Sequence, residues 1–389
     1  MGVGMREGRW EPVNVAGDER VLAHIPPALP PSPLNLERLL TTLGHADRAL
    51  GRLDGLTRMI PEISLFLYMY VRKEAILSSQ IEGTQSSLSD LLLYELSEEP
   101  GVPMDDVAEV SNYVAALEHG LRRIREGFPI STRLFREMHE ILLRKARGEQ
   151  ADLGEFRRSQ NWIGGSRPGN ALYVPPPAHY IDACMSDLEK FIHNDQNDLH
   201  VLIKAGLTHV QFESIHPFLD GNGRLGRLLV TLILCTEGVL REPLLYLSLY
   251  FKHHRQSYYE MLQGVRTEGD WENWLCFFLE AIRSTAQQAA ETAQQVIEQF
   301  EKDRKRISAL GSSGNSALRL HETFQRNPLL SVSRAHEFLN VTKPTINTAM
   351  RQLEDLGIVR EVTGRKRDRV FAYTEFLRIL SQGTEPIEP

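Results

Sequence analysis

Residues 216–227 combine side chains that chemistry at a phosphate group needs. The stretch is His-Pro-Phe-Leu-Asp-Gly-Asn-Gly-Arg-Leu-Gly-Arg, and the apolar segment 228–233 follows it. This order predicts a glycine-rich turn that leads into the N-terminus of a helix, where free backbone N–H groups and the helix dipole favour phosphate. Arg224 and Arg227 lie three residues apart on the first helical turn, so both guanidinium groups can reach the same anion. Two arginines indicate more than one phosphate.

Two further side chains beside this turn can take part in the reaction. Asp220 can hold Mg²⁺ together with phosphate oxygens and waters. His216 titrates near neutral pH, as a general base must, although a lone histidine before proline is more often structural than catalytic. Residues 221–226 also match the dinucleotide-binding fingerprint. That fingerprint requires a preceding buried strand, whereas the segment before this turn has helical periodicity, so we reject that alternative.

The elements that must position this turn are predicted to be mostly α-helical. The chain has 389 residues, enough for two or three domains, and its apolar fraction of 42% is ordinary for a globular protein. A formal net charge of −7 argues against a protein that mainly coats nucleic acid. Apolar residues recur at helical spacing in segments 34–96, 107–126, 131–147, 178–193, 199–214, 224–235 and 246–266, followed by a long helical segment that ends near residue 306.

Three segments depart from the helical pattern. Residues 161–165 and 171–174 predict two short strands joined by 166–170, which is a β-hairpin on an α-helical scaffold. The first thirty or so residues are polar and end in a proline-rich stretch, so we expect an extended arm. Residues 311–315 are predicted to be a flexible linker that precedes a compact piece of about seventy residues.

Other polar and sulfur side chains have plainer interpretations. Cys184, Cys235 and Cys276 are far apart in the sequence, which is typical of buried thiols in a reducing compartment. The chain shows neither a signal-peptide pattern nor an apolar run long enough for a membrane span, so we expect a cytoplasmic protein. Residues 193–200 are rich in His, Asn and Asp but match no metal-ligand spacing, and we interpret them as a polar turn with Asp198 as a helix cap.

The loop resembles the signature of the Fic family, His-x-Phe-x-(Asp/Glu)-Gly-Asn-Gly-(Arg/Lys)-x-x-Arg, at every defined position. This resemblance implies a mainly α-helical Fic core and a protein adenylyltransferase that moves AMP from ATP onto a Ser, Thr or Tyr hydroxyl of a target protein. By the resemblance, His216 is the catalytic base, Asp220 holds Mg²⁺ and Phe218 anchors the loop. The resemblance also assigns the contacts with ATP, which are expected from Gly221, Asn222, Gly223, Arg224, Leu225, Gly226 and Arg227.

Two more segments resemble parts of the same family. The predicted hairpin occupies the place of a flap that pairs with an extended stretch of the target, so Ile163, Leu172, Tyr173 and Val174 are expected to dock it. The alternative is an ordinary packing hairpin. Residues 250–259 resemble the wall around the nucleotide base, with His254 where relatives often carry Asn.

Residues 78–83 resemble the family's inhibitory motif, (Ser/Thr)-x-x-x-Glu-(Gly/Asn), with Ser78, Glu82 and Gly83 at its defined positions. The resemblance implies that Glu82 takes Arg227 away from the γ phosphate of ATP and so keeps activity low. The alternative is that Glu82 only lies at an exposed helix end. Some relatives use this glutamate to remove AMP, and the sequence leaves that second activity open.

The last seventy residues resemble a winged helix-turn-helix. Helices are predicted at 333–339 and 343–356, and strands at 358–362 and 370–373. We divide the chain into an N-terminal arm and inhibitory region at 1–110, a Fic core at 111–310 and a winged-helix domain at 316–389. A DNA-binding regulator whose Fic domain senses ATP is the rival function, and a docking or homodimer role for the winged helix also stays open. The expected DNA contacts are Lys343, Thr345, Asn347 and Arg351 on the second helix, and Arg365, Lys366 and Arg367 on the wing.

Overall fold

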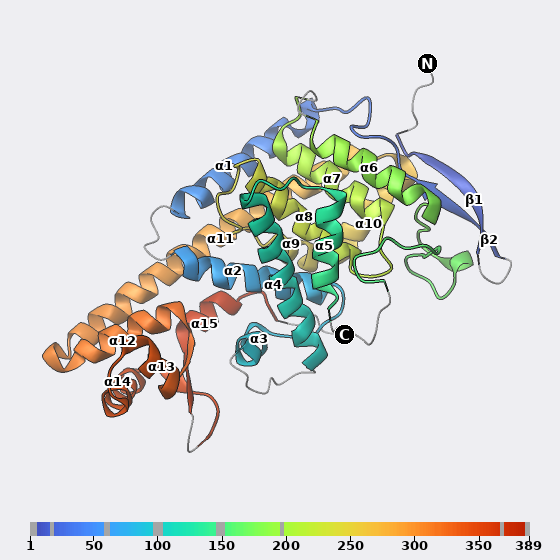
Figure 1. The fold of residues 1–389 in the computed structure, drawn as a ribbon. Helices are drawn as coiled ribbons and strands as arrows, with labels where there is room; N and C mark the ends of the chain where they lie inside the picture. The colour runs from blue at the N-terminus through green and yellow to red at the C-terminus, as the bar shows by residue number, and fades with distance from the viewer. Residues whose placement is uncertain are drawn as a thin grey trace.

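The protein is mainly α-helical, as the sequence predicts (Figure 1). The structure is a computed structural model that describes residues 6–15, 19–57, 63–95, 104–144, 152–194, 198–365 and 369–385. Most of its helices form one helical core, and a smaller domain follows. The core helices are α1 (Leu40–Thr57), α2 (Ile63–Ile81), α3 (Leu88–Glu95), α4 (Met104–Arg125), α5 (Thr132–Leu142), α6 (Ile181–Ile192), α7 (Val201–Ile215), α8 (Asn222–Thr236), α9 (Ser248–His253), α10 (Arg255–Glu268) and α11 (Trp271–Ser308).

Helices α7 and α8 lie side by side at the centre of the core and carry the loop between them. In α7 every residue from Leu202 to Ile215 is buried, and α8 is buried from Arg224 to Leu234. Helices that are buried on all sides cannot be amphipathic, which is why both have apolar residues all round their axes. The surrounding helices α4, α5, α6, α10 and α11 therefore fix the position of residues 216–221 from several directions (Figure 1).

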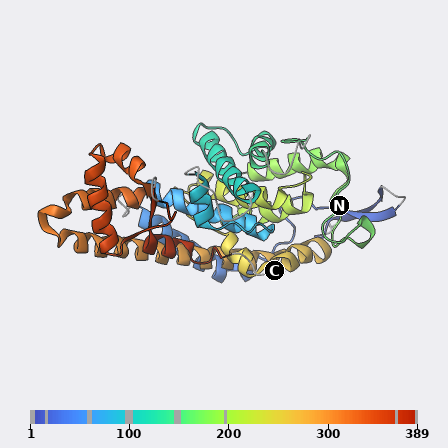
Figure 2. The same ribbon diagram turned by 90° about the horizontal axis from the view of Figure 1, so that it is seen from below.

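Helix α11 runs along most of the length of the molecule (Figure 2). It packs against α1 along the core and then continues to the smaller domain. Its 38 residues correspond to roughly 57 Å at 1.5 Å per residue. The predicted flexible linker at 311–315 is wrong, because Gly311–Gly314 form a 3-10 turn that leads directly into the next helix at Asn315. Glycine and serine composition predicted flexibility there, but the turn closes on α11 instead.

The predicted extended arm is instead a two-stranded antiparallel hairpin, β1 (Arg9–Val15) and β2 (Glu19–Ile25). The sequence did not predict these strands because the segment is mostly polar and contains Pro12. Proline is tolerated on edge strands, and both strands of a two-stranded ribbon are edge strands. The His24 backbone N–H donates a hydrogen bond to the Val174 carbonyl at 2.8 Å, so β2 lies beside the segment predicted as the flap.

The smaller domain has helices and strands where the sequence predicts them in residues 333–373, and we call it the winged-helix domain after that prediction, which stays a prediction. It contains α12 (Asn315–Arg326), β3 (Leu329–Ser331), α13 (Val332–Leu339), α14 (Lys343–Asp355), β4 (Val359–Glu361), β5 (Val370–Tyr373) and α15 (Thr374–Ser381). The three strands form an antiparallel sheet in the order β3-β5-β4. Strand β3 was not predicted, because three residues are too few to show an alternating pattern.

After α15 the chain returns to the helical core. The Gln80 side-chain amide donates hydrogen bonds to the Ser86 carbonyl at 3.0 Å and to the Thr384 carbonyl at 2.8 Å. The Lys252 ammonium donates to the Gly383 carbonyl at 3.2 Å. Residues 382–385 therefore contact both α2 and α9 of the core.

Two further sequence interpretations concern the thiols and membranes. The three cysteines are free thiols, but each is partly exposed, so the prediction that they are buried is wrong. Each lies at the margin of the core rather than inside it. Among the described residues, the helices are either too short or too polar to span a bilayer.

Candidate active site

The loop between α7 and α8 is held in an unusual backbone conformation at both of its ends. His216 ends α7 in the left-handed region with φ 49° and ψ 60°, and Gly221 precedes α8 with φ 76°. Only glycine adopts such positive φ values without steric cost. The Asn222 side chain closes the loop, since its Oδ1 accepts from the Phe218 N–H and its Nδ2 donates to the Phe218 carbonyl, both at 2.9 Å. The loop motif thus stabilises its own turn.

His216 is held as a neutral imidazole. Burial lowers its pKa to about 3, and the positive charges of Arg266 and Arg157 act in the same direction. Its Nδ1 is buried, and a hydrogen bond with the Glu213 backbone acts in the opposite direction without outweighing burial. The side chain therefore has the protonation state of a base.

Phe218 and Asp220 divide the loop between the core and the surface. The Phe218 ring is buried and stacks on His139 with ring centroids 3.8 Å apart, as expected for an anchor. His139 Nε2 donates to the Asp220 carbonyl at 3.1 Å, which fixes the main chain there. The Asp220 side chain is 53% exposed and its Oδ1 accepts from the Gly221 N–H at 2.6 Å. A single accessible carboxylate beside a phosphate-binding turn fits Mg²⁺, which takes its other ligands from phosphates and water.

Arg224 forms a buried ion pair that the sequence analysis missed. Its Nη1 lies 3.0 Å from Oε2 of Glu109 on α4, and both side chains are almost fully buried. Its Nη2 lies 3.6 Å from Asp220 Oδ1, and its Nε is buried without a partner among the described residues. Glu109 therefore compensates the buried charge of Arg224.

Arg227 pairs with the residues of the inhibitory motif. Its Nη2 lies 2.7 Å from Glu82 Oε1, its Nε donates to Ser78 Oγ at 2.8 Å, and Nη2 also donates to the Ser78 carbonyl at 3.0 Å. Glu82 follows the end of α2, and Gly83 after it has φ 107°. A Cβ atom added to Gly223 would collide with Glu82 Oε1. The carboxylate therefore lies directly against the glycines of the loop, where an anion would bind.

Residues on the inner side of α8 face the core rather than the loop. Leu225 is buried in the apolar core, and the Gly226 carbonyl accepts a hydrogen bond from His209 Nδ1 at 3.0 Å. The Leu225 side chain and the Gly226 carbonyl therefore face the core, and contacts of these two residues with ATP stay a prediction. His209 is packed in the core, as predicted. Glu213, which the sequence analysis missed, lies against Gly226, and burial raises its pKa to about 7 although Arg227 acts in the opposite direction.

The predicted flap is less regular than two strands. It is a single antiparallel bridge between Ile163 and Tyr173, with a 3-10 turn at Pro168–Asn170. Leu172 is 76% exposed and Ile163 is partly exposed, so both can meet a target.

The side chains of Tyr173 and Val174 are buried, so docking at these residues would use the main chain, and their docking role stays a prediction. The Tyr173 hydroxyl donates to the Ser214 carbonyl at 2.7 Å, which turns the ring toward the core. Trp162 is 40% exposed on the same segment and is an apolar contact that the sequence analysis missed.

His254 lies between α9 and α10 and is exposed. Its ring centroid is 4.2 Å from that of Tyr250. Its contact with a nucleotide base stays a prediction.

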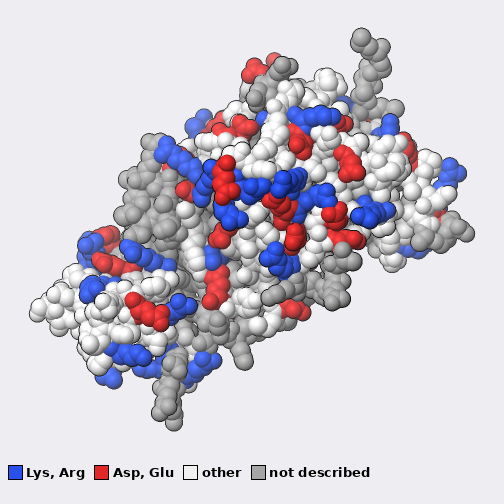
Figure 3. All heavy atoms as spheres, in the orientation of Figure 1, with Lys and Arg blue, Asp and Glu red and all other residues white. Residues whose placement is uncertain are grey.

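The predicted DNA contacts lie on the winged-helix domain. Lys343 and Arg351 of α14 and Arg365 of the wing are exposed, while Thr345 and Asn347 are partly exposed. Lys and Arg side chains gather along the lower edge of this domain in Figure 3. Lys366 and Arg367 lie outside the described residues.

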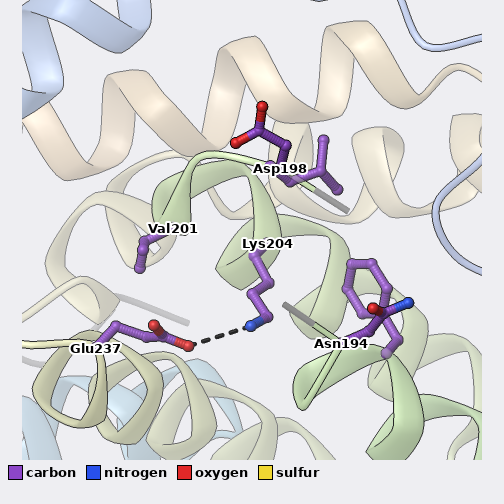
Figure 4. A pocket seen from close by; sticks show the side chains of 7 residues that line it. Asn194, Asp198, Val201, Lys204 and Glu237 are labelled. Carbon is purple, nitrogen blue, oxygen red and sulfur yellow. Dashed lines mark hydrogen bonds and ion pairs between the residues drawn. The ribbon is translucent and has the colours of Figure 1, made fainter. Parts of the chain in front are cut away.

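Asn194, Asp198 and Leu199 of the predicted polar turn border a small hollow (Figure 4), and residues 195–197 lie outside the described residues. Lys204 and Glu237 form an ion pair of 3.1 Å there, beside Asn194 and Asp198. The hollow measures about 180 Å³, below the range of about 300–1,000 Å³ that is common for ligand pockets. Groups of three or more metal-ligating side chains are absent from the described residues.

Asp198 is not the helix cap predicted, because the ring of His200 accepts from the Leu202 N–H at the start of α7.

Comparisons with known proteins agree with this geometry. Residues 40–122 match the Fic/DOC family N-terminal region, and residues 129–234 match the Fic/DOC family itself. The chain is 30% identical over 209 residues to the Aedes aegypti protein named protein adenylyltransferase Fic, an alignment that covers 53% of this chain and 39% of that protein. It is 26% identical over 255 residues to the Drosophila yakuba protein of the same name, covering 64% of this chain and 47% of that protein. The chain thus spans less than half the length of these relatives.

A solved structure extends the likeness of the fold to most of the chain. A Fic family protein from Desulfovibrio desulfuricans G20 superposes with a TM-score of 0.58 at 20% sequence identity, covering 88% of this chain and 97% of that one. The two family matches adjoin and enclose the loop, so the chain contains a Fic/DOC family N-terminal region at 40–122 and a Fic/DOC family domain at 129–234.

Proposed function

We propose that the protein transfers AMP from ATP to a Ser, Thr or Tyr hydroxyl of a target protein. The observation that carries this proposal is the position of a neutral, partly buried His216 on the same closed loop as the glycines and arginines that start α8. Two relatives named protein adenylyltransferase Fic support the reaction type.

The residues suggest a division of roles in this reaction. His216 takes the proton of the target hydroxyl, whose oxygen attacks the α phosphorus in line as the bond to pyrophosphate breaks. The N–H groups of Gly221, Asn222 and Gly223 and the positive end of α8 bind phosphate oxygens. Arg224 and Arg227 hold the outer phosphates. Asp220 would hold Mg²⁺, which neutralises charge on the phosphates when it is bound.

The resting enzyme in this proposal is inhibited by Glu82. The carboxylate pairs with Arg227 and lies against Gly223, so it competes with the γ phosphate for both the cation and the space. Ser78 supports the arrangement because it holds the same guanidinium from α2. ATP can then bind only after Glu82 moves, or with its phosphates displaced from the line of attack.

The position of the label in ATP tests this function. We expect the purified Glu82→Gly protein to acquire label from ATP that is radioactive at the α phosphorus and none from ATP labelled at the γ phosphorus. The transferred group should also appear in mass spectrometry as a gain of one AMP on a hydroxyl side chain. Label from γ-labelled ATP alone would indicate a kinase and contradict the proposal.

DNA binding by the winged-helix domain is a second candidate function. Its support is the exposure of Lys343 and Arg351 on α14, the second helix of the helix-turn-helix, together with Arg365 on the wing. We expect gel-shift titrations with duplex DNA to show affinity that falls steeply as salt rises, and Arg351→Ala to reduce that slope. Arg319→Ala on α12 serves as the control. Binding that does not change with salt, or none at low salt, would exclude this role.

A further inference from the structure

Arg157 joins three segments of the site through one side chain. Its Nε donates to the His216 carbonyl at 2.9 Å, Nη1 to the Ser159 carbonyl at 3.0 Å, and Nη2 to the Pro176 carbonyl at 2.5 Å. Its own backbone N–H donates to the Pro217 carbonyl at 3.0 Å. Ser159 and Pro176 flank the flap, two residues outside each of its ends, so the guanidinium connects the base of the flap to the loop that carries His216.

The chemistry of the guanidinium suits this connection. The group is planar and presents its N–H donors in a fixed fork, so three acceptors bonded to it are also fixed relative to each other. Arg157 is 2% exposed, and these hydrogen bonds from a charged donor are shielded from water. The three acceptors are main-chain carbonyls, so the side chain determines the course of the backbone.

The contact with His216 matters because of that residue's conformation. A non-glycine residue at φ 49° persists only where its surroundings hold it there. The backbone dihedral angles of His216 set the direction both of its carbonyl, which accepts from Arg157, and of its imidazole. A hydrogen bond that fixes the carbonyl therefore helps to fix the imidazole. Arg157 also adds a positive charge beside the imidazole, which favours its neutral form.

We propose that Arg157 is a positioning residue that holds the His216 main chain and the base of the flap in one arrangement, so that a hydroxyl carried on the flap meets the imidazole. This inference rests on the proposed AMP transfer and adds a residue to it. The hydrogen bonds of Arg157 described above involve neither the predicted phosphate-binding residues nor Glu82. Substitution of Arg157 should therefore change the rate of the chemical step rather than the affinity for ATP.

Lysine at this position separates positioning from charge. Arg157→Lys keeps a cation, but one ammonium group lacks the planar fork that spans three carbonyls. In a Glu82→Gly background we expect Arg157→Lys to lower kcat for self-labelling with AMP by about 10- to 100-fold, with the KM for ATP within about 2-fold. Arg158→Lys, at the neighbouring exposed arginine, should leave both constants unchanged. An unchanged kcat in Arg157→Lys, or a KM that rises as much as kcat/KM falls, would overturn the inference.

A second readout does not depend on activity. The readout is the NMR spectrum of the full chain labelled with nitrogen-15 histidine. The His216 imidazole resonance is assigned by its loss in His216→Ala. We expect Arg157→Lys, in the otherwise native chain, to shift this resonance. The resonance of the exposed His45 should stay in place. If the Glu82→Gly parent transfers no AMP, the proposed function fails, and this spectrum alone decides the role of Arg157. An unmoved His216 resonance in a folded lysine variant would refute it.

Discussion

Replacing His216 with alanine in a Glu82→Gly background is expected to lower the rate of AMP transfer by about 10²- to 10⁴-fold, the usual contribution of a positioned general base. The phosphate-binding turn begins after this residue, and Asn222 closes the loop through Phe218 rather than through the imidazole. ATP affinity should therefore stay within a few fold of the parent. Radiolabel incorporation gives the rate, and isothermal titration with ATP and Mg²⁺ gives the affinity.

The exposed His45 on α1 provides the control for this substitution, and His45→Ala should retain full activity. The comparison also separates an enzyme from a regulator that only senses ATP. A sensor has no need of a base, so its response to ATP would survive His216→Ala. Full transfer activity in that variant would mean that a different group accepts the proton.

Replacing Glu82 with glycine is expected to raise the rate of AMP transfer by about 10- to 100-fold, in the range of ordinary couplings between sites. The carboxylate lies 2.7 Å from Arg227 Nη2, and that guanidinium is 1% exposed. Without Glu82 the buried cation loses its charged partner, so an incoming phosphate restores a favourable contact rather than competing for one. Steady-state labelling of the parent and the variant at equal ATP measures the change.

Glu126→Gly is the matched control, since Glu126 also lies just past the end of a core helix, α4, and is exposed. It should not change the rate.

The variant Glu82→Gly should also melt at a lower temperature than the parent in the absence of ATP and recover part of the difference when ATP is added, because ligand binding stabilises the folded state. Equal labelling by the parent and Glu82→Gly would refute the inhibitory role.

The sequence could predict the loop because its chemistry is local. The residues from His216 to Arg227 are contiguous, and their spacing alone places the two arginines on one helical turn. The central helices were predictable for the same reason, since apolar residues repeat along each of them. Local pattern also explains the errors at residues 311–315 and at the first strands, where composition was polar or glycine-rich although the folded chain is ordered.

The partners of the loop residues could not be predicted, because they come from elements distant in the sequence. Glu109 lies 115 residues before Arg224, and nothing near either residue specifies their pairing. A partial indication existed, since Glu109 shares a helix face with the buried Tyr113 and Ala116, and a carboxylate on an apolar face needs a cation. The three carbonyls that accept hydrogen bonds from Arg157 could not be predicted from the sequence, because every residue carries a main-chain carbonyl whatever its side chain.

The winged-helix domain is joined to the core by more than one connection. The uninterrupted helix α11 leads into it, α15 packs against α2, and residues 382–385 return onto α2 and α9 through Gln80 and Lys252 (Figures 1 and 2). A domain attached to the core at separate places cannot rotate freely about any one of them. Any rotation of this domain must bend the long helix, break the bonds at Gln80 and Lys252, or pull on α2 two residues before Glu82.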